Sequence, residues 1–408
     1  MSTKTIAIAA ICVTMAACST KNEEVANRVE LPGTVDNEKF VANIESIPVM
    51  NLEMSDEWLF DDELRFCISD KYLYLLCGDQ INLTCLDRHT GEKLSGRTIK
   101  GNGPGEVNYL NSAFCIGDTL CIYENAIHKY SNNGDFLGKT PEIDKLGSIS
   151  DIFRLTNGDY VGIYLDIRTP DSIPSKVVVA DKSFNVKARH FDLPKVLLFI
   201  SIGGSGKSYS VNGDTVRFLF YSHMDNHLYT LCGDTELCTE LGLPNPQTAE
   251  RFVEVSDKVI QTHDGAAIDE LFEYDGNFRN LSESGRFVCL CYTIDKSKRY
   301  VSLIDKRTNS AVSLFSEDEQ QDTLMHSLYG VLINMQVLHS DGEYIYALCK
   351  NRDLVPLLEG HDDELNNCLQ KAQSDYHAYL DRNAEYMKSM EPEERDLANV
   401  ILKIKLKD

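Results

Sequence analysis

The sequence predicts an all-β fold built from repeated four-stranded antiparallel sheets, and three observations lead to this prediction. From about residue 45 onward, apolar and polar residues alternate in short runs, which is the period of a β-strand. Turn residues such as Ser69-Asp70-Lys71 separate these runs. The whole group recurs roughly every 40 to 70 residues, a spacing typical of propeller blades. Because blades packed in a ring bury both faces of each sheet, we predict a closed six-bladed β-propeller.

The first blade shows the repeat most clearly. Two alternating runs, 64–68 and 72–76, are joined by a three-residue turn, a third run covers 81–86, and the turn 88–92 leads into a fourth strand. Five later turns open the other blades: Gly117-Asp118, Asn157-Gly158-Asp159, Asn212-Gly213-Asp214, Ser284-Gly285-Arg286 and Ser340-Asp341-Gly342.

Closure of such a ring predicts that the two ends of the chain share a blade. Residues 44–52 precede the first complete blade, and Leu402, Ile404 and Leu406 alternate with lysines near the C-terminus. We expect these two segments to pair in the last blade.

One segment departs from the strand pattern. Between about residues 362 and 391, apolar residues recur at three- and four-residue steps, which predicts one amphipathic helical insertion in the last blade. Asp362 or Asp363 is the expected N-cap, and Pro392 the expected end. Packing against the propeller wall is the interpretation we favour; docking of a partner is the alternative.

The N-terminus resembles a lipoprotein leader. Residues 1–17 have a positive start and a short apolar run, which indicates a signal peptide rather than a membrane span. Met15-Ala16-Ala17-Cys18 resembles a bacterial lipobox, so we expect lipidation of Cys18; ordinary cleavage, with Cys18 as a bystander, is the alternative. Residues 18–40 then form a tether, and 41–408 the propeller. Lys21 and the acids behind it resemble a surface-export signal of Bacteroidetes lipoproteins; a plain solvated tether is the alternative.

Composition narrows the function classes. A net charge of -23 argues against nucleic-acid binding, which needs a basic surface, and against docking of the folded domain on anionic lipid. We therefore expect membrane contact through the lipid anchor only. Most cysteines after Cys18 lie in apolar runs, so we interpret them as small buried hydrophobic residues.

The loop between the first two blades carries a family resemblance. The run Lys100-Gly101-Asn102-Gly103-Pro104-Gly105-Glu106-Val107 is similar to the G-x-G-P-G-E-[YF] loop of six-bladed β-propeller lipoproteins of Bacteroidetes, related in fold to TolB-like and NHL propellers. Val107 replaces the usual aromatic residue. The resemblance covers about residues 40–408 and implies a propeller on an exported outer-membrane lipoprotein, with surface exposure as a hypothesis and no established activity.

Two motifs imitate known ligand sites. Residues 201–208 look like a phosphate-binding loop, but its first Gly position is Ser201 and a strand pattern follows where a helix is needed. His223 and His227 have a metal-like spacing in a turn context that does not bring them together. We therefore expect no cofactor and no metal, and we assign no catalytic residue.

Loop placement supplies the candidate site. Function on propellers resides mostly in loops around one end of the channel. Residues placed there by their position before innermost strands form the candidate ligand rim: Asp61, Asp62, Glu106, Asn108, Tyr109, Asp151 and Arg279.

Three functions follow from this architecture. The first is a lipid-anchored cell-envelope binding or scaffold protein that presents propeller loops to a glycan, peptide or protein partner. The second is an extracellular hydrolase or lyase acting on polymer at the channel mouth, which loss of turnover in Asp61→Asn and Glu106→Gln would support. The third is a subunit of an envelope complex that docks through the helical insertion.

Overall fold

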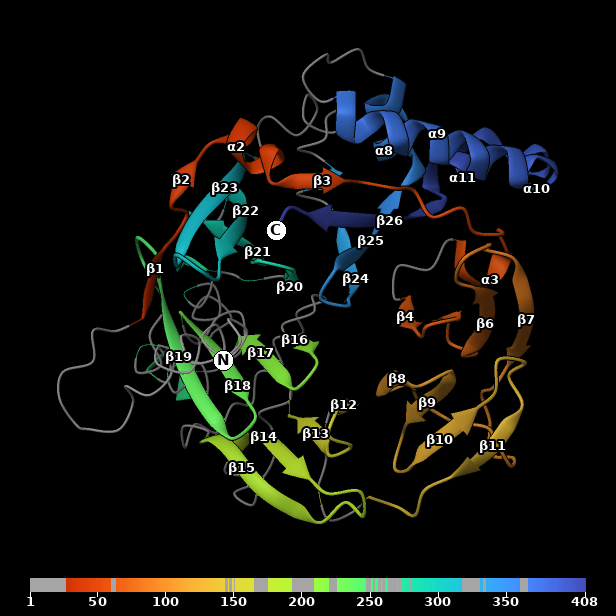
Figure 1. Cartoon of the computed structure of the whole chain (residues 1–408), viewed down its shortest axis with the longest axis horizontal. Helices are drawn as coiled ribbons and strands as arrows, with labels where there is room; N and C mark the ends of the chain where they lie inside the picture. The colour runs from red at the N-terminus through yellow and green to blue at the C-terminus, as the bar shows by residue number, and fades with distance from the viewer. Residues whose placement is uncertain are drawn as a thin grey trace, which may run out of the picture.

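The computed structural model shows six β-sheets arranged radially around a central axis, each with its first strand innermost (Figure 1). This confirms the predicted six-bladed propeller of mostly four-stranded antiparallel blades. The structure describes residues 27–408 except 60–63, 144–145, 147–148, 150, 165–174, 193–208, 220–225, 247–250, 252–253, 256–257, 259–260, 263–269, 271–272, 277, 279, 296, 318–330, 333–334 and 360–365.

Blades 1 to 3 are plain meanders in which each strand pairs antiparallel with the preceding one. Their turns form because short polar side chains bind the backbone: Asp87 accepts hydrogen bonds from the N–H groups of His89 and Thr90 at 2.9 and 2.7 Å. The strands are β4 (Arg65–Ile68), β5 (Tyr72–Cys77), β6 (Asn82–Asp87), β7 (Lys93–Thr98), β8 (Ser112–Ile116), β9 (Thr119–Tyr123), β10 (Ile127–Tyr130), β11 (Phe136–Lys139), β12 (Asp151–Arg154), β13 (Tyr160–Ile163), β14 (Ser175–Ala180) and β15 (Val186–Asp192).

Blades 4 and 5 each carry a fifth, parallel strand at the outer edge. Every residue of β21 is buried, because neighbouring blades cover both faces of its sheet. The strands are β16 (Tyr209–Asn212), β17 (Thr215–Leu219), β18 (His227–Cys232), β19 (Thr235–Gly242), β20 (Asn280–Ser284), β21 (Phe287–Ile294), β22 (Lys298–Asp305) and β23 (Ser310–Glu317), with β1 (Arg28–Glu30) beside β19 and β2 (Thr34–Val35) beside β23.

The added strands come from the N-terminal segment, which crosses the outside of blades 4 and 5 before it reaches blade 6 (Figure 1). Val29 and Leu31 are buried against these blades, and the helix α2 (Asn37–Ala42) buries Phe40. Part of the segment 18–40, which the sequence assigns to a tether, therefore belongs to the folded body. Two- and three-residue strands are too short for an alternation pattern to mark them.

Blade 6 joins the two ends of the chain, as the sequence predicts. It contains β24 (Gln336–Ser340), β25 (Tyr344–Lys350), β26 (Asn399–Leu406) and, outermost, β3 (Ile44–Ser46). The pairing of β26 with β3 is extended by a bridge between Val49 and Leu402. The ring is thus closed by hydrogen bonds between β3, which precedes blade 1 in the chain, and β26, the last strand of the chain.

The helical insertion lies between β25 and β26 and is longer than predicted. It comprises α8 (Asn351–Glu359), α9 (Asn366–Arg382), α10 (Ala384–Ser389) and α11 (Pro392–Leu397); a further short helix, α3 (Asp56–Leu59), precedes blade 1. Pro392 begins α11 instead of ending the insertion, because proline fits the first turn of a helix, where no backbone N–H is needed. The predicted N-caps Asp362 and Asp363 lie outside the described residues.

The insertion packs on the propeller, in agreement with the favoured interpretation. Ala372, Tyr376 and Tyr379 of α9 are buried in the same core cluster as blade 6. Asn383, between α9 and α10, donates to the carbonyl of Leu52 at 2.9 Å and accepts from the N–H of Met54 at 2.8 Å. The helices are therefore fixed to the segment that connects blade 6 with blade 1.

Candidate functional site

The two ends of the channel differ in their connections. Because strands alternate in direction, the turns after innermost and third strands all lie at one end. There the connections are short, such as 117–118 and 213–214, and we call this the tight-turn end. At the other end the connections include 243–279 and 351–398, and we call it the long-loop end. The candidate rim residues that the structure describes, Glu106, Asn108, Tyr109 and Asp151, lie at the long-loop end.

Polar contacts tie the blades together at the tight-turn end. They span five blade junctions: Lys71–Asp118 at 3.1 Å, Thr156 N–H to Asp214 at 2.8 Å, Asn212 to Glu283 at 3.2 Å, Ser284 hydroxyl to Glu343 carbonyl at 2.6 Å, and Arg88–Asp341 at 3.6 Å. Side chains at this end are thus engaged in holding the ring.

The Gly-rich loop at the long-loop end folds on itself. The Glu106 carboxylate accepts from the Gly103 N–H at 2.7 Å, and a Cβ on Gly101 would lie 2.1 Å from that carboxylate. Gly105, with a φ of +79°, leaves no room for a Cβ against Phe136, and its carbonyl accepts from the Tyr130 hydroxyl at 3.1 Å. Burial raises the pKa of Tyr130 to about 12, so it stays a neutral donor. The motif therefore builds the loop, and Glu106 acts first as its internal brace.

Three predicted rim residues come together beside this loop. The Asn108 side chain donates to Asn102 at 3.0 Å, and its backbone N–H donates to the Glu124 carboxylate at 3.1 Å. Tyr109 projects from this polar frame with 59% of its surface exposed. We call Asn102, Glu106, Asn108, Tyr109 and Glu124 the rim patch.

Asp151 is a correction to the predicted rim. It is only 5% exposed, at the start of the innermost strand of blade 3, and it accepts a hydrogen bond from the Tyr209 hydroxyl of blade 4. The carbonyl of the next residue, Ile152, accepts a hydrogen bond of 3.1 Å from the Ser112 hydroxyl of blade 2. Asp151 thus joins blade 3 to blade 4 instead of facing the solvent.

Other predicted features lie outside the described residues. They are Cys18, Asp61, Asp62 and Arg279, the phosphate-loop-like stretch 201–208 and most of the His223–His227 segment.

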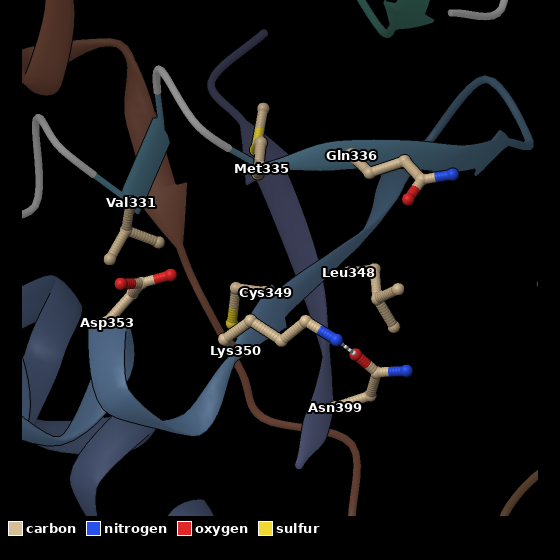
Figure 2. Close-up of a pocket in the computed structure, with 8 residues that line it drawn as sticks. All are labelled: Val331, Met335, Gln336, Leu348, Cys349, Lys350, Asp353 and Asn399. Atoms are coloured by element: carbon tan, nitrogen blue, oxygen red, sulfur yellow. Dashed lines mark hydrogen bonds between the residues drawn. The ribbon is translucent and has the colours of Figure 1, made fainter. Parts of the chain in front are cut away.

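A cavity of about 170 Å³ opens where the helical insertion leaves blade 6. Figure 2 shows Val331 facing the carboxylate of Asp353 on one side and the hydrogen bond from Lys350 to Asn399, 2.8 Å long, on the other. Its lining is Val331, Met335, Gln336, Leu348, Cys349, Lys350, Asp353 and Asn399. Since these residues begin β24 and β26 and end β25, the cavity lies at the long-loop end.

The cavity combines an apolar wall with a small set of polar groups. Burial raises the pKa of the Cys349 thiol well above its ordinary value, so this cysteine is uncharged and unreactive as a nucleophile. Lys350 and Asp353 bring one positive and one negative charge to the same small space. Asp353 also lies 3.8 Å from the Arg352 guanidinium, and Lys350 donates to Asn399, so both charges have partners within the protein.

Comparison with known proteins settles the family. Residues 17–346, most of the chain, match the model of the DUF5128 family, described as 6-bladed beta-propeller. The chain belongs to the DUF5128 family. The matched residues stop within β25, so the helical insertion and the closing strand of this DUF5128 propeller follow the matched part.

Two solved structures share the fold of this DUF5128 propeller at low identity. A candidate exported protein of Bacteroides fragilis NCTC 9343 has 15% identity and a TM-score of 0.59, over 93% of this chain and 99% of that one. A member of the DUF4221 family from Bacteroides vulgatus has 10% identity and a TM-score of 0.51, over 90% and 98% of the two chains. No curated protein matches the sequence significantly.

The described part of the DUF5128 propeller contains neither a metal-type cluster nor a membrane-type helix. Within it, no group of three or more His, Cys, Asp or Glu side chains is arranged to hold a metal ion. Among the helices described there, none is both long enough and apolar enough to cross a membrane.

Sequence reasoning named three residues of the rim patch, Glu106, Asn108 and Tyr109, but not Asn102, Glu124 or the cavity. Gln336, Lys350 and Asn399 stand at strand ends, where polar residues are ordinary, and they are far apart in sequence. Only the pairing of β26 with β25, across the helical insertion, brings Asn399 beside Lys350. The predicted closure of the last blade was the one sequence feature that bears on the position of the cavity, because it implies that β26 pairs within this blade.

Proposed function

We propose that this DUF5128 propeller is a lipid-anchored binding or scaffold protein of the cell envelope, which presents its long-loop end to a glycan, peptide or protein partner. The observation that carries this proposal is the asymmetry of the channel ends. Lys71 with Asp118 and Arg88 with Asp341 at the tight-turn end are engaged between blades, whereas Tyr109 stands exposed on a fixed polar frame at the long-loop end. Exposed aromatic side chains on rigid loops are typical anchors of binding interfaces.

The size of the cavity favours a partner larger than a metabolite. Pockets that enclose small molecules have about 300 to 1,000 Å³. The blade 6 cavity, at about 170 Å³, holds only part of such a ligand. A partner that lies across the long-loop end and places one group in the cavity fits both features.

The envelope location has separate support. The family contains propellers, and the structural neighbour from Bacteroides fragilis is described as a candidate exported protein. Lipidation at Cys18 and outer-membrane attachment rest on the lipobox resemblance. Replacement Cys18→Ser should move the protein from the membrane fraction to the soluble fraction; unchanged membrane attachment would refute lipidation at this residue.

Photo-crosslinking from the rim patch tests the binding role. A benzophenone amino acid at Tyr109 should give a discrete adduct on whole cells. The matched control places it at Leu137, which is 58% exposed against 59% for Tyr109 but lies on the outer strand of blade 2. Equal labelling from both positions, or none from Tyr109, would refute a partner at the long-loop end. A crosslinked partner whose mass decreases with time, as expected if the protein cleaves it, would instead favour the hydrolase or lyase hypothesis.

A further inference from the structure

The blade 6 cavity has one side that solvent reaches. Gln336, Lys350 and Asp353 are half-buried, whereas Val331, Met335 and Leu348 are buried. We call the half-buried polar residues the opening of the cavity and the buried apolar residues its floor; Figure 2 labels both sets. Its position at the long-loop end places it on the surface that the proposed function assigns to the partner.

The charges of the opening select a neutral occupant. Lys350 donates to Asn399 at 2.8 Å and Asp353 lies 3.8 Å from the Arg352 guanidinium, so both charged groups of the opening already have partners within the protein and offer little to a charged occupant. A charged group would also lose its hydration against Val331, Met335 and Leu348, and nothing on that wall compensates for the loss. An apolar group instead gains from leaving water.

The polar groups of the opening match a polypeptide. The Gln336 side chain carries a donor and an acceptor in one amide, which is the complement of a peptide group. In the described part of the lining no aromatic ring is present to stack on a sugar face. The floor is built from aliphatic and sulfur-containing side chains, and it suits another flexible or branched aliphatic group.

From these observations we infer that the blade 6 cavity receives a neutral apolar side chain, of leucine or methionine size, from a polypeptide partner. This inference rests on the proposed binding function and deepens it by naming the chemistry of the partner. The Gln336 amide binds the partner's backbone beside the inserted side chain.

The methyl group of Met335 offers a direct readout, since this residue lines the cavity. The full chain, with methionine methyl groups labelled with carbon-13, is titrated with N-acetyl-leucine methylamide at millimolar concentrations. Replacement Met335→Leu identifies the relevant resonance. We expect a saturable shift of that resonance, at least about tenfold weaker affinity for N-acetyl-aspartate methylamide, and no saturable shift with methyl glucoside.

Two cavity variants and one control make the test specific. Val331→Phe fills the cavity and should abolish the shift, whereas Leu397→Phe, on an exposed leucine of α11, should leave it unchanged. If Val331→Phe does not fold, Val331→Ala enlarges the cavity and should turn the preference toward N-acetyl-phenylalanine methylamide.

The outcomes separate this inference from the proposed function. A Met335 resonance that does not respond to the leucine probe, or responds equally to the aspartate probe, overturns the inference. If that happens while Tyr109 still crosslinks a partner, the binding function stands. A saturable leucine response without any crosslink supports the cavity and removes the proposed envelope partner.

Discussion

Replacement of Glu283 should destabilise the whole propeller, because this carboxylate is the centre of a buried ion cluster between blades 4 and 5. Its side chain is 4% exposed and contacts Arg217, Lys306 and Asn212. Burial alone would raise its pKa, but the positive charges of Arg217 and Lys306 outweigh burial and hold the pKa below the ordinary value.

Glu283→Ala leaves two cations without their partner. Breaking a buried ion pair costs about 3 to 5 kcal/mol. Because the side chains of Arg217 and Lys306 are 18% and 26% exposed, water recovers part of that cost, and we expect about 2 to 4 kcal/mol. With an unfolding entropy of about 2 cal/mol/K per residue, the melting temperature should fall by about 3 to 5 °C.

The same cluster predicts a pH dependence of defined sign. A carboxyl group with a lowered pKa in the folded state stabilises the protein above its unfolded pKa of about 4.3, and this contribution is lost as the pH falls through the folded pKa. The difference in unfolding free energy between the wild type and Glu283→Gln should therefore be constant above about pH 5 and shrink below about pH 4.

Urea unfolding across pH provides the assay. Glu343→Ala is the control, because this glutamate is 62% exposed on the adjoining turn and should change stability by less than about 0.5 kcal/mol. If Glu283→Ala unfolds within that same margin of the wild type, the reasoning about the buried cluster is wrong.

Three further perturbations test the closure, the Gly-rich loop and the helical insertion. Deletion of residues 398–408 should abolish cooperative unfolding, because it removes the strand that joins the chain ends; a truncated protein with an unchanged melting temperature would contradict the closure. Gly105→Ala should lower the free energy of unfolding, measured by denaturant titration, by about 2 kcal/mol or more, since the new Cβ would lie 2.5 Å from the Phe136 side chain. Gly117→Ala is the control: it has a similar positive φ but open space for the Cβ, and it should lower the free energy of unfolding by about 1 kcal/mol. Asn383→Ala should lower the free energy of unfolding by about 2 to 4 kcal/mol and speed hydrogen exchange in α9, because it removes the hydrogen bonds to Leu52 and Met54. The control Gln370→Ala, at an exposed position of the same helix, should do neither. Equal exchange rates in both variants would contradict a role of Asn383 in holding the helices.

The blade architecture could be predicted from sequence because each blade repeats local signals. A strand pattern, a short Asp- or Gly-containing turn and a second strand lie within about ten residues of each other, so the pattern and the pairing are both local. Ring closure was also predictable, because a lone alternating segment at each end of a propeller has one place to pair. The register of β26 against β3 confirms that reasoning.

The remaining features depend on contacts that span the chain. The pairing of Arg28 with Glu240 and of Thr34 with Val312 joins segments more than two hundred residues apart, and strands this short leave no periodic signal. Asp151 was misplaced for a related reason. Its position before an innermost strand was correct, but its contact with Tyr209 depends on how closely neighbouring blades approach.

The described contacts differ between the two channel ends, and this difference separates the proposed binding surface from contacts that close the ring. At the tight-turn end, the Lys71–Asp118 and Arg88–Asp341 pairs span blade junctions, so a substitution in either pair perturbs the closed ring. At the long-loop end, Tyr109 contributes exposed surface while Gly105 and Asn108 hold its frame. Because the hydrogen bonds of that frame stay within blades 1 and 2, replacement of the Tyr109 side chain removes binding surface without removing a contact that closes the ring. A substitution of Tyr109 therefore tests the proposed partner contact separately from the stability of the ring.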